Sequence, residues 1–134
     1  MLGGIIEKLG LGAAGDAKQL VARLPGSGLA VAAIEEVLLR ALARAGHRQA
    51  ALDGDSAEAA IALDLPEGDA AYAMLERIVA ATRVGGTVIV AGTSARAQDR
   101  ARIAGLLLRA GLVALRQDLE GSTVYTSARV GERL

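Results

Sequence analysis

The stretch that decides the fold is RVGGTVIVAG, residues 83–92, in which two glycines feed a short apolar run rich in β-branched residues. A strand that is apolar on both faces is typical of a parallel sheet covered by helices on both sides. The run before the glycines, AAYAMLERIVAAT (70–82), places apolar residues at helical spacing. We therefore expect a helix that ends at Gly85 and Gly86 and is followed by a buried strand.

The same order of helix, glycine and strand recurs along the chain. LAVAAIEEVLLRALARA (29–45) runs into Gly46, and RAQDRARIAGLLLRA (96–110) runs into Gly111. This alternation predicts βα units on a largely parallel sheet with helices covering it.

The end of the chain departs from that rhythm. LVALRQDL (112–119) and STVYTSARV (122–130) are separated by only Glu120 and Gly121, too few residues for a crossover helix. These strands must pair as an antiparallel hairpin. The expected fold class is therefore α/β, Rossmann-like, with a mostly parallel sheet flanked by helices and a C-terminal antiparallel β-hairpin.

The composition bounds the function. The 134 residues suffice for one core, which must be aliphatic because the chain has no Phe or Trp and two Tyr. Fifteen basic residues balance fifteen acidic ones, so no net field favours nucleic acid. With no Cys and one His, we expect neither disulfides nor a metal site. No apolar stretch predicts a membrane span and no leader is visible, so we expect a cytoplasmic protein without integral membrane association.

The chain divides into a short N-terminal segment and one α/β domain, residues 16–134. Residues 1–15 are glycine-rich and predict a flexible or docking helix. Four apolar residues lie close to one face of that helix and are candidates for an interface: Leu2, Ile5, Ile6 and Leu9.

The second half of the chain resembles the class I S-adenosylmethionine-dependent methyltransferases. LERIVAATRVGGTVIVAG (75–92) is similar to the helix, glycine turn and fifth strand of that family, and IAGLLLRAGLVALRQDLEGSTVYTSARV (103–130) to its following helix and terminal hairpin. The resemblance implies a cofactor site in the first half. There a glycine-rich loop after the first strand approaches the amino-acid end of the cofactor, and a carboxylate after the second strand holds the ribose hydroxyls.

Candidate positions for that site follow from the resemblance. QLVARLPGSGLAV (19–31) could supply the first strand, the loop and the start of a helix. Asp53 or Asp55 falls where the ribose-binding carboxylate belongs, and Asp64 would lie near a substrate. The cofactor-binding candidates, if the protein is active, are Gly26, Ser27, Gly28, Asp53 and Asp64. The first strand could instead be GLAVAAI (28–34), which would reduce Gly26 and Gly28 to a turn before it.

The chain departs from the family pattern in ways that bear on activity. Almost no room remains between Gly54 and Glu58 for the strand and helices that the family places there. The methyltransferase-like domain of the anamorsin family, which has also lost the cofactor loop, is similar in shape. We expect a catalytically degenerate domain with no cofactor, which binds another protein or forms a homo-oligomer. The alternative is a small S-adenosylmethionine-dependent methyltransferase, and a third reading is an anion binder that uses helix N-termini at Ser27 and Ser94.

Overall fold

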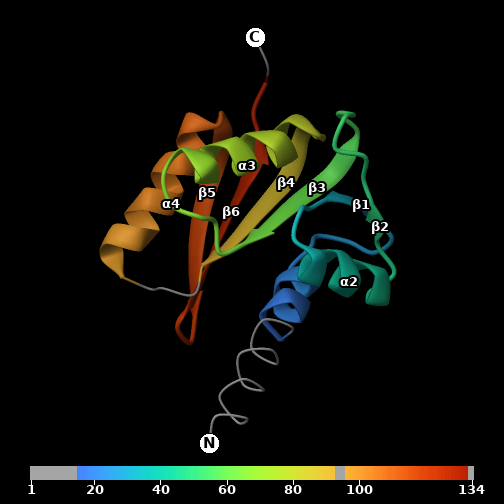
Figure 1. The fold of residues 1–134 in the computed structure, drawn as a ribbon, viewed down its shortest axis with the longest axis horizontal. Coiled ribbons are helices and arrows are strands. Elements are labelled where there is room, and N and C mark those ends of the chain that lie inside the picture. Colours follow the sequence, from blue (N-terminus) through green and yellow to red (C-terminus); the bar gives the residue numbers. More distant parts are fainter. Residues whose placement is uncertain (1–14, 93–95, 133–134) are drawn as a thin grey trace, which may run out of the picture.

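The computed structural model describes residues 15–92 and 96–132. Its centre is a six-stranded sheet with the strand order β2-β1-β3-β4-β6-β5 (Figure 1). The first four strands are parallel, and β6 runs antiparallel to both β4 and β5. The strands are β1 (Ala30–Ala32), β2 (Arg48–Gln49), β3 (Ala57–Leu63), β4 (Thr82–Gly92), β5 (Leu112–Glu120) and β6 (Thr123–Val130). The expected α/β class and its C-terminal hairpin are confirmed.

Helices cover both faces of this sheet. They are α2 (Glu36–Arg44), α3 (Asp69–Ala80) and α4 (Ala97–Arg109), preceded by a helical segment at residues 15–22. Helices α3 and α4 pack on one face, and segment 15–22 and α2 pack on the other (Figure 1). The doubly apolar strands explain this arrangement, because successive side chains point to opposite faces. Ala60 and Val88 enter the first core, whereas Ile61 and Ile89 enter the second.

The first strand is the later of the two registers that the sequence left open. Residues 15–22, which include the start of QLVARL, are helical, and the strand is Ala30–Ala32. The helix expected from residue 29 therefore begins only at Glu36. Ser27 does not cap it, because Glu35 is the N-cap residue. Sheet pairing with β2 and β3 overrides the helical pattern of residues 30–32.

The glycine pair of the opening stretch lies inside a strand and does not end a helix, which corrects that expectation. Helix α3 ends at Ala80, where the Thr82 hydroxyl donates to the Ile78 carbonyl at 2.7 Å. The register of β4 against β3 then shifts between Thr82 and Thr87. Gly85 has φ +80°, and a Cβ on Gly86 would lie 2.6 Å from Thr82 Cγ2. The glycines thus permit an irregularity in which the strand folds tightly against itself.

One side-chain cluster joins the N-terminal helical segment to the C-terminal hairpin. The Arg23 guanidinium lies 3.7 Å from the centre of the Tyr125 ring and 2.6 Å from Glu120 Oε2. The Tyr125 hydroxyl donates to Gln19 Oε1 at 3.2 Å. Arg23 therefore links the two ends of the described chain through both charge and aromatic contact. The residues expected at an interface, Leu2, Ile5, Ile6 and Leu9, lie outside the described residues.

Candidate functional site

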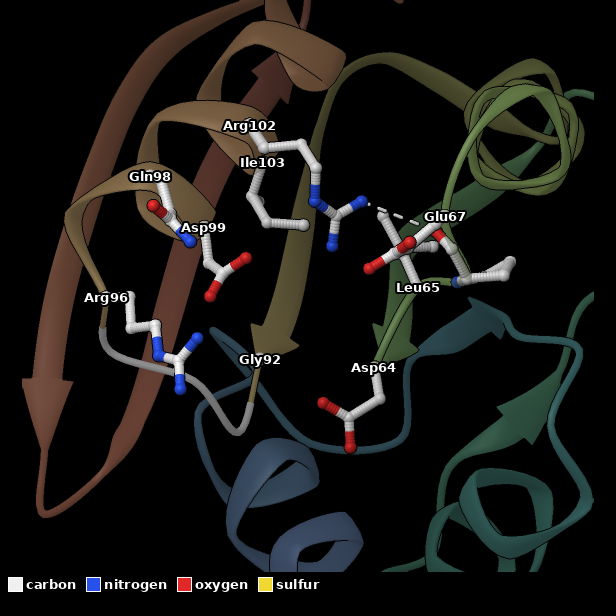
Figure 2. Close-up of a pocket in the computed structure, with 10 residues that line it drawn as sticks. Asp64, Leu65, Glu67, Gly92, Arg96, Gln98, Asp99, Arg102 and Ile103 are labelled. Carbon is white, nitrogen blue, oxygen red and sulfur yellow. Dashed lines mark hydrogen bonds between the residues drawn. The ribbon is translucent and has the colours of Figure 1, made fainter.

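The carboxyl ends of β3 and β4 open onto a cleft of about 960 Å³ (Figure 2). Open α/β sheets bind ligands at this edge, and the volume is of the size that small-molecule sites have. One wall is the segment after β3, and the other is the first turns of α4. The lining side chains include carboxylates and guanidinium groups, so the cleft suits a polar ligand better than an apolar one.

Asp64 stands at the end of β3 and lines the cleft. Its φ of 50° is uncommon for a residue other than glycine. Its backbone N–H donates to the Ala91 carbonyl at 2.8 Å, which fixes this conformation beside the end of β4. Asp64 is thus the sequence candidate that the structure places in a cleft. Its backbone conformation adds to this, because backbone strain of this kind is concentrated at functional sites.

Helix α4 supplies the opposite wall with charged residues that the sequence did not single out as a site. Arg96, Asp99 and Arg102 all line the cleft. Figure 2 shows the Arg102 side chain crossing toward the segment after β3, where its Nη1 donates to the Pro66 carbonyl at 3.3 Å. Within the described residues, no group of three or more His, Cys, Asp or Glu is placed to hold a metal ion.

Glu35 occupies the carboxyl end of β1, on the way into α2. As the N-cap residue it makes no side-chain cap; instead its Oε2 accepts a 2.6 Å hydrogen bond from the Leu63 N–H at the end of β3. Its other carboxylate oxygen, Oε1, is buried and has no hydrogen-bond partner among the described residues. The carboxylate thus takes up the space between the ends of two neighbouring strands.

The environment of Glu35 changes its acidity. Desolvation by burial raises the pKa of this carboxyl above its ordinary value, and the nearby charge of Asp64 raises it further. The hydrogen bond from Leu63 N–H opposes these effects, because it stabilises the charged form. The balance favours a protonated Glu35 over a wider pH range than an exposed glutamate would show.

The structure does not bring the sequence-predicted cofactor residues together. The segment with Gly26, Ser27 and Gly28 precedes β1 and so lies at its amino end, away from the edge where β3 and β4 open. Asp53 lies in an exposed turn of the connection between β2 and β3. Of the candidates, only Asp64 lines the cleft.

Glu35 is the residue that the sequence reasoning missed. Its signal was present in the second register, in which AVAAIEE reads as a strand followed at once by acidic residues.

Ser27, proposed as a helix N-terminus for anions, lies in the exposed approach to β1. Ser94 lies outside the described residues.

None of the helices within residues 15–92 and 96–132 has the length and apolar character needed to cross a membrane. Among known proteins, no family model matches the chain. No curated protein matches it either.

Solved structures, by contrast, share its fold. One is a chain of the complex between a methyltransferase activator and a candidate methyltransferase from Haloferax volcanii. Its TM-score is 0.63 at 15% identity, and the match covers 88% of this chain and 89% of that chain. Another is a 16S rRNA N2 methyltransferase from T. thermophilus in complex with AdoMet and guanosine. Its TM-score is 0.60 at 15% identity, and the match covers 87% of this chain and 39% of that chain.

A third is human N-acetylserotonin methyltransferase in complex with SAM, with a TM-score of 0.61 at 13% identity. The match covers 87% of this chain and 52% of that chain. The chain therefore spans about half or less of the length of these two cofactor-bound enzymes. At such identities the likeness concerns the fold alone. That fold is the class I methyltransferase-like one, as the C-terminal half of the sequence suggested.

Proposed function

We propose that this chain, which has the class I methyltransferase-like fold, is a catalytically degenerate domain that serves as a protein-binding or assembly module. The observation that carries the proposal is the junction between β1 and α2. A glycine-rich loop in this position lets the backbone approach a cofactor closely. Here only Ala33, Ile34 and Glu35 join the two elements, and Glu35 holds its carboxylate against the end of β3.

The shortened edge of the sheet supports the same proposal. Strand β2 has two residues and is the last strand on its side. The chain passes from it to β3 through residues 50–56, without another strand or helix. A dinucleotide-sized or nucleoside-sized ligand at the ends of β1 and β2 would therefore lack a side wall, and its burial would be small.

The opposite edge of the sheet supports a binding role. Strand β5 pairs with β6 on one side only, and it is the outermost strand on that side of the sheet. Apolar side chains are exposed there: Leu119 at 59% and Val113 at 50%, with Leu108 of the adjacent α4 at 61%. Exposed strand edges pair readily with other chains. An irregularity at Ala114, with φ 57°, interrupts the edge and leaves residues 116–120 as its regular part.

A similar structure adds circumstantial support, since it is a complex between a methyltransferase activator and a candidate methyltransferase. Two surfaces of this chain are candidates for such an assembly or for self-association. One is the β5 edge, and the other is the apolar set Leu2, Ile5, Ile6 and Leu9.

Light scattering at high micromolar concentration tests the assembly role. We expect a particle larger than one chain, and Leu119→Lys or Ile6→Asp should return it to the mass of one chain, according to which surface is used. Val84→Lys is the matched control, because Val84 is 48% exposed but lies in β4, away from the β5 edge. A wild-type protein with the mass of one chain would contradict self-association, and the proposal would then require a heterologous partner.

The second candidate function is a small S-adenosylmethionine-dependent methyltransferase. It is favoured by the cleft beside Asp64 and by the likeness to enzymes solved with AdoMet or SAM. If the domain is active, S-adenosylhomocysteine should bind, and Asp64→Ala should weaken binding. Asp53→Ala tests the ribose-binding role. Unchanged binding in both variants would remove these residues from any cofactor site.

A further inference from the structure

A groove of about 780 Å³ runs between helical segment 15–22 and α2, on the face of the sheet opposite α3 and α4. Figure 1 shows these two helical elements together on one side of the sheet. The groove shares no lining residue with the cleft beside Asp64. Its volume lies within the range of small-molecule sites.

The floor of the groove is apolar. Val21 and Leu24 are buried beneath it, and Val37 and Ala41 of α2 are half-buried along it. A ligand lying on these side chains would remove more of their surface from water. The hydrophobic effect would favour a ligand with an apolar body.

The rim of the groove is basic. Lys18 comes from segment 15–22, and Arg40 and Arg44 come from successive turns of α2; all three are exposed. No Asp or Glu is among the described residues that line the groove, although acidic and basic residues balance over the whole chain. The positive potential is therefore a local property of this surface.

Two of these cations lack a partner in the described part of the chain. Arg40 forms an exposed ion pair with Glu36 at 2.7 Å, one turn away. Neither Lys18 nor Arg44 forms an ion pair with any residue within 15–92 or 96–132. The Lys18 ammonium and the Arg44 guanidinium can therefore receive an anion without breaking an ion pair to any residue that the structure describes.

His47 adds a neutral donor at the end of the groove that follows α2. Its Nδ1 accepts a 3.0 Å hydrogen bond from the Leu29 N–H. In this arrangement the ring proton resides on Nε2, which is a hydrogen-bond donor. The polar groups that line the groove thus include cations and a hydrogen-bond donor. These groups complement an oxyanion, which carries negative charge and accepts hydrogen bonds.

We propose that this groove binds a small anionic amphiphile, with an apolar body on the floor and a carboxylate or phosphate monoester head between Lys18 and Arg44. Guanidinium groups favour both heads because their geometry matches two oxygens at once. A cationic head would be repelled, and a neutral head would forgo the charge-assisted hydrogen bonds. The inference is independent of the assembly role proposed above.

The test is a ¹H–¹⁵N NMR titration of the full chain with monomeric decanoate, decyl phosphate, decanol and decyltrimethylammonium. We expect saturable shifts at residues 15–26 and 37–47 with the two anions, of which the tighter one identifies the preferred head. Decanol should bind about tenfold more weakly, as the loss of a charge-assisted hydrogen bond implies. The cationic probe should not bind.

Substitutions locate the site. Arg44→Gln and Lys18→Gln should each weaken decanoate binding by about three- to tenfold, because each removes one charged contact. Arg77→Gln is the control, since Arg77 is exposed on α3 across the sheet. Absence of saturable binding, equal affinity for decanol and decanoate, or full affinity in both groove variants would overturn the proposal. So would binding to phosphatidylglycerol vesicles alone, which would indicate a membrane surface as the ligand.

Discussion

The two halves of the sheet are built to different degrees. Strands β3, β4, β5 and β6 have 7, 11, 9 and 8 residues, whereas β1 and β2 have 3 and 2. The long strands carry most of the core, and the short ones belong to the half of the chain in which the resemblance in the sequence implied a cofactor site. On the proposed function, this difference means that the half with the long strands keeps the core, while the half with the short strands, the ligand half, has lost its cofactor site.

The largest expected effect comes from shortening a buried side chain in the core beneath α3. Leu75 is fully buried, so Leu75→Ala should lower the free energy of unfolding by about 2–5 kcal/mol through lost burial and a residual cavity. Urea denaturation measures this change. The neighbouring Glu76 is exposed, and Glu76→Ala should stay within about 0.5 kcal/mol. A comparable loss from Gln49→Ala in exposed β2 would break the contrast between the halves.

Gly86 tests the tight irregularity in β4. A Cβ there would lie 2.6 Å from Thr82 Cγ2 and 2.9 Å from the Arg83 carbonyl oxygen. Gly86→Ala should therefore cost about 1–3 kcal/mol of unfolding free energy, as overpacking typically does. Gly54, in the short half, has only an ordinary 3.8 Å neighbour, and Gly54→Ala should leave stability nearly unchanged. Equal thermal denaturation midpoints for the two variants would contradict the account.

How far the fold could be predicted follows from these elements. Residues 87–92 and the hairpin were recognisable because their apolar pattern and short turn leave few alternatives. Residues 30–32 were recognised only as one of two alternatives for the first strand, since three residues inside a helical pattern carry no period of their own, and their pairing with β2 and β3 decides their conformation.

The candidate site could be predicted only in part. Asp64 follows a recognisable apolar strand, so its place at the sheet edge could be expected. Glu35 could not be located until the first strand was known. Arg96 and Arg102 became part of the cleft only through the packing of α4 on β5 and β6 and against α3, which no local pattern of the sequence specifies.

Arg23 tests the link between the N-terminal helical segment and the hairpin. Arg23→Gln removes both the contact with the Tyr125 ring and the ion pair with Glu120, and should lower the free energy of unfolding by about 0.5–2 kcal/mol. Arg40→Gln breaks the exposed pair with Glu36 and should cost no more than about 0.5 kcal/mol. Denaturant titrations of both variants compare the two. Equal costs would mean that the Arg23 cluster adds nothing beyond a surface ion pair.

The smallest expected effect is a pH dependence at Glu35. Because the folded-state pKa is raised, ionising this carboxyl costs the folded state more than the unfolded state. The stability of the wild type should therefore fall, relative to Glu35→Gln, as pH rises from about the ordinary value of 4.5 through the raised pKa. Unfolding free energies of both proteins across that range measure the difference. A constant difference would show that Glu35 ionises equally readily in both states.

Isothermal titration of the full chain with S-adenosylmethionine tests the central claim most directly, which is that the ligand half no longer holds the cofactor. We expect no saturable heat up to millimolar cofactor, because on the proposed function Glu35 occupies the junction of β1 and α2, where a glycine-rich loop would otherwise approach the cofactor. Saturable binding at micromolar concentration, abolished by Asp64→Ala, would contradict the account and assign the domain to active methyltransferases.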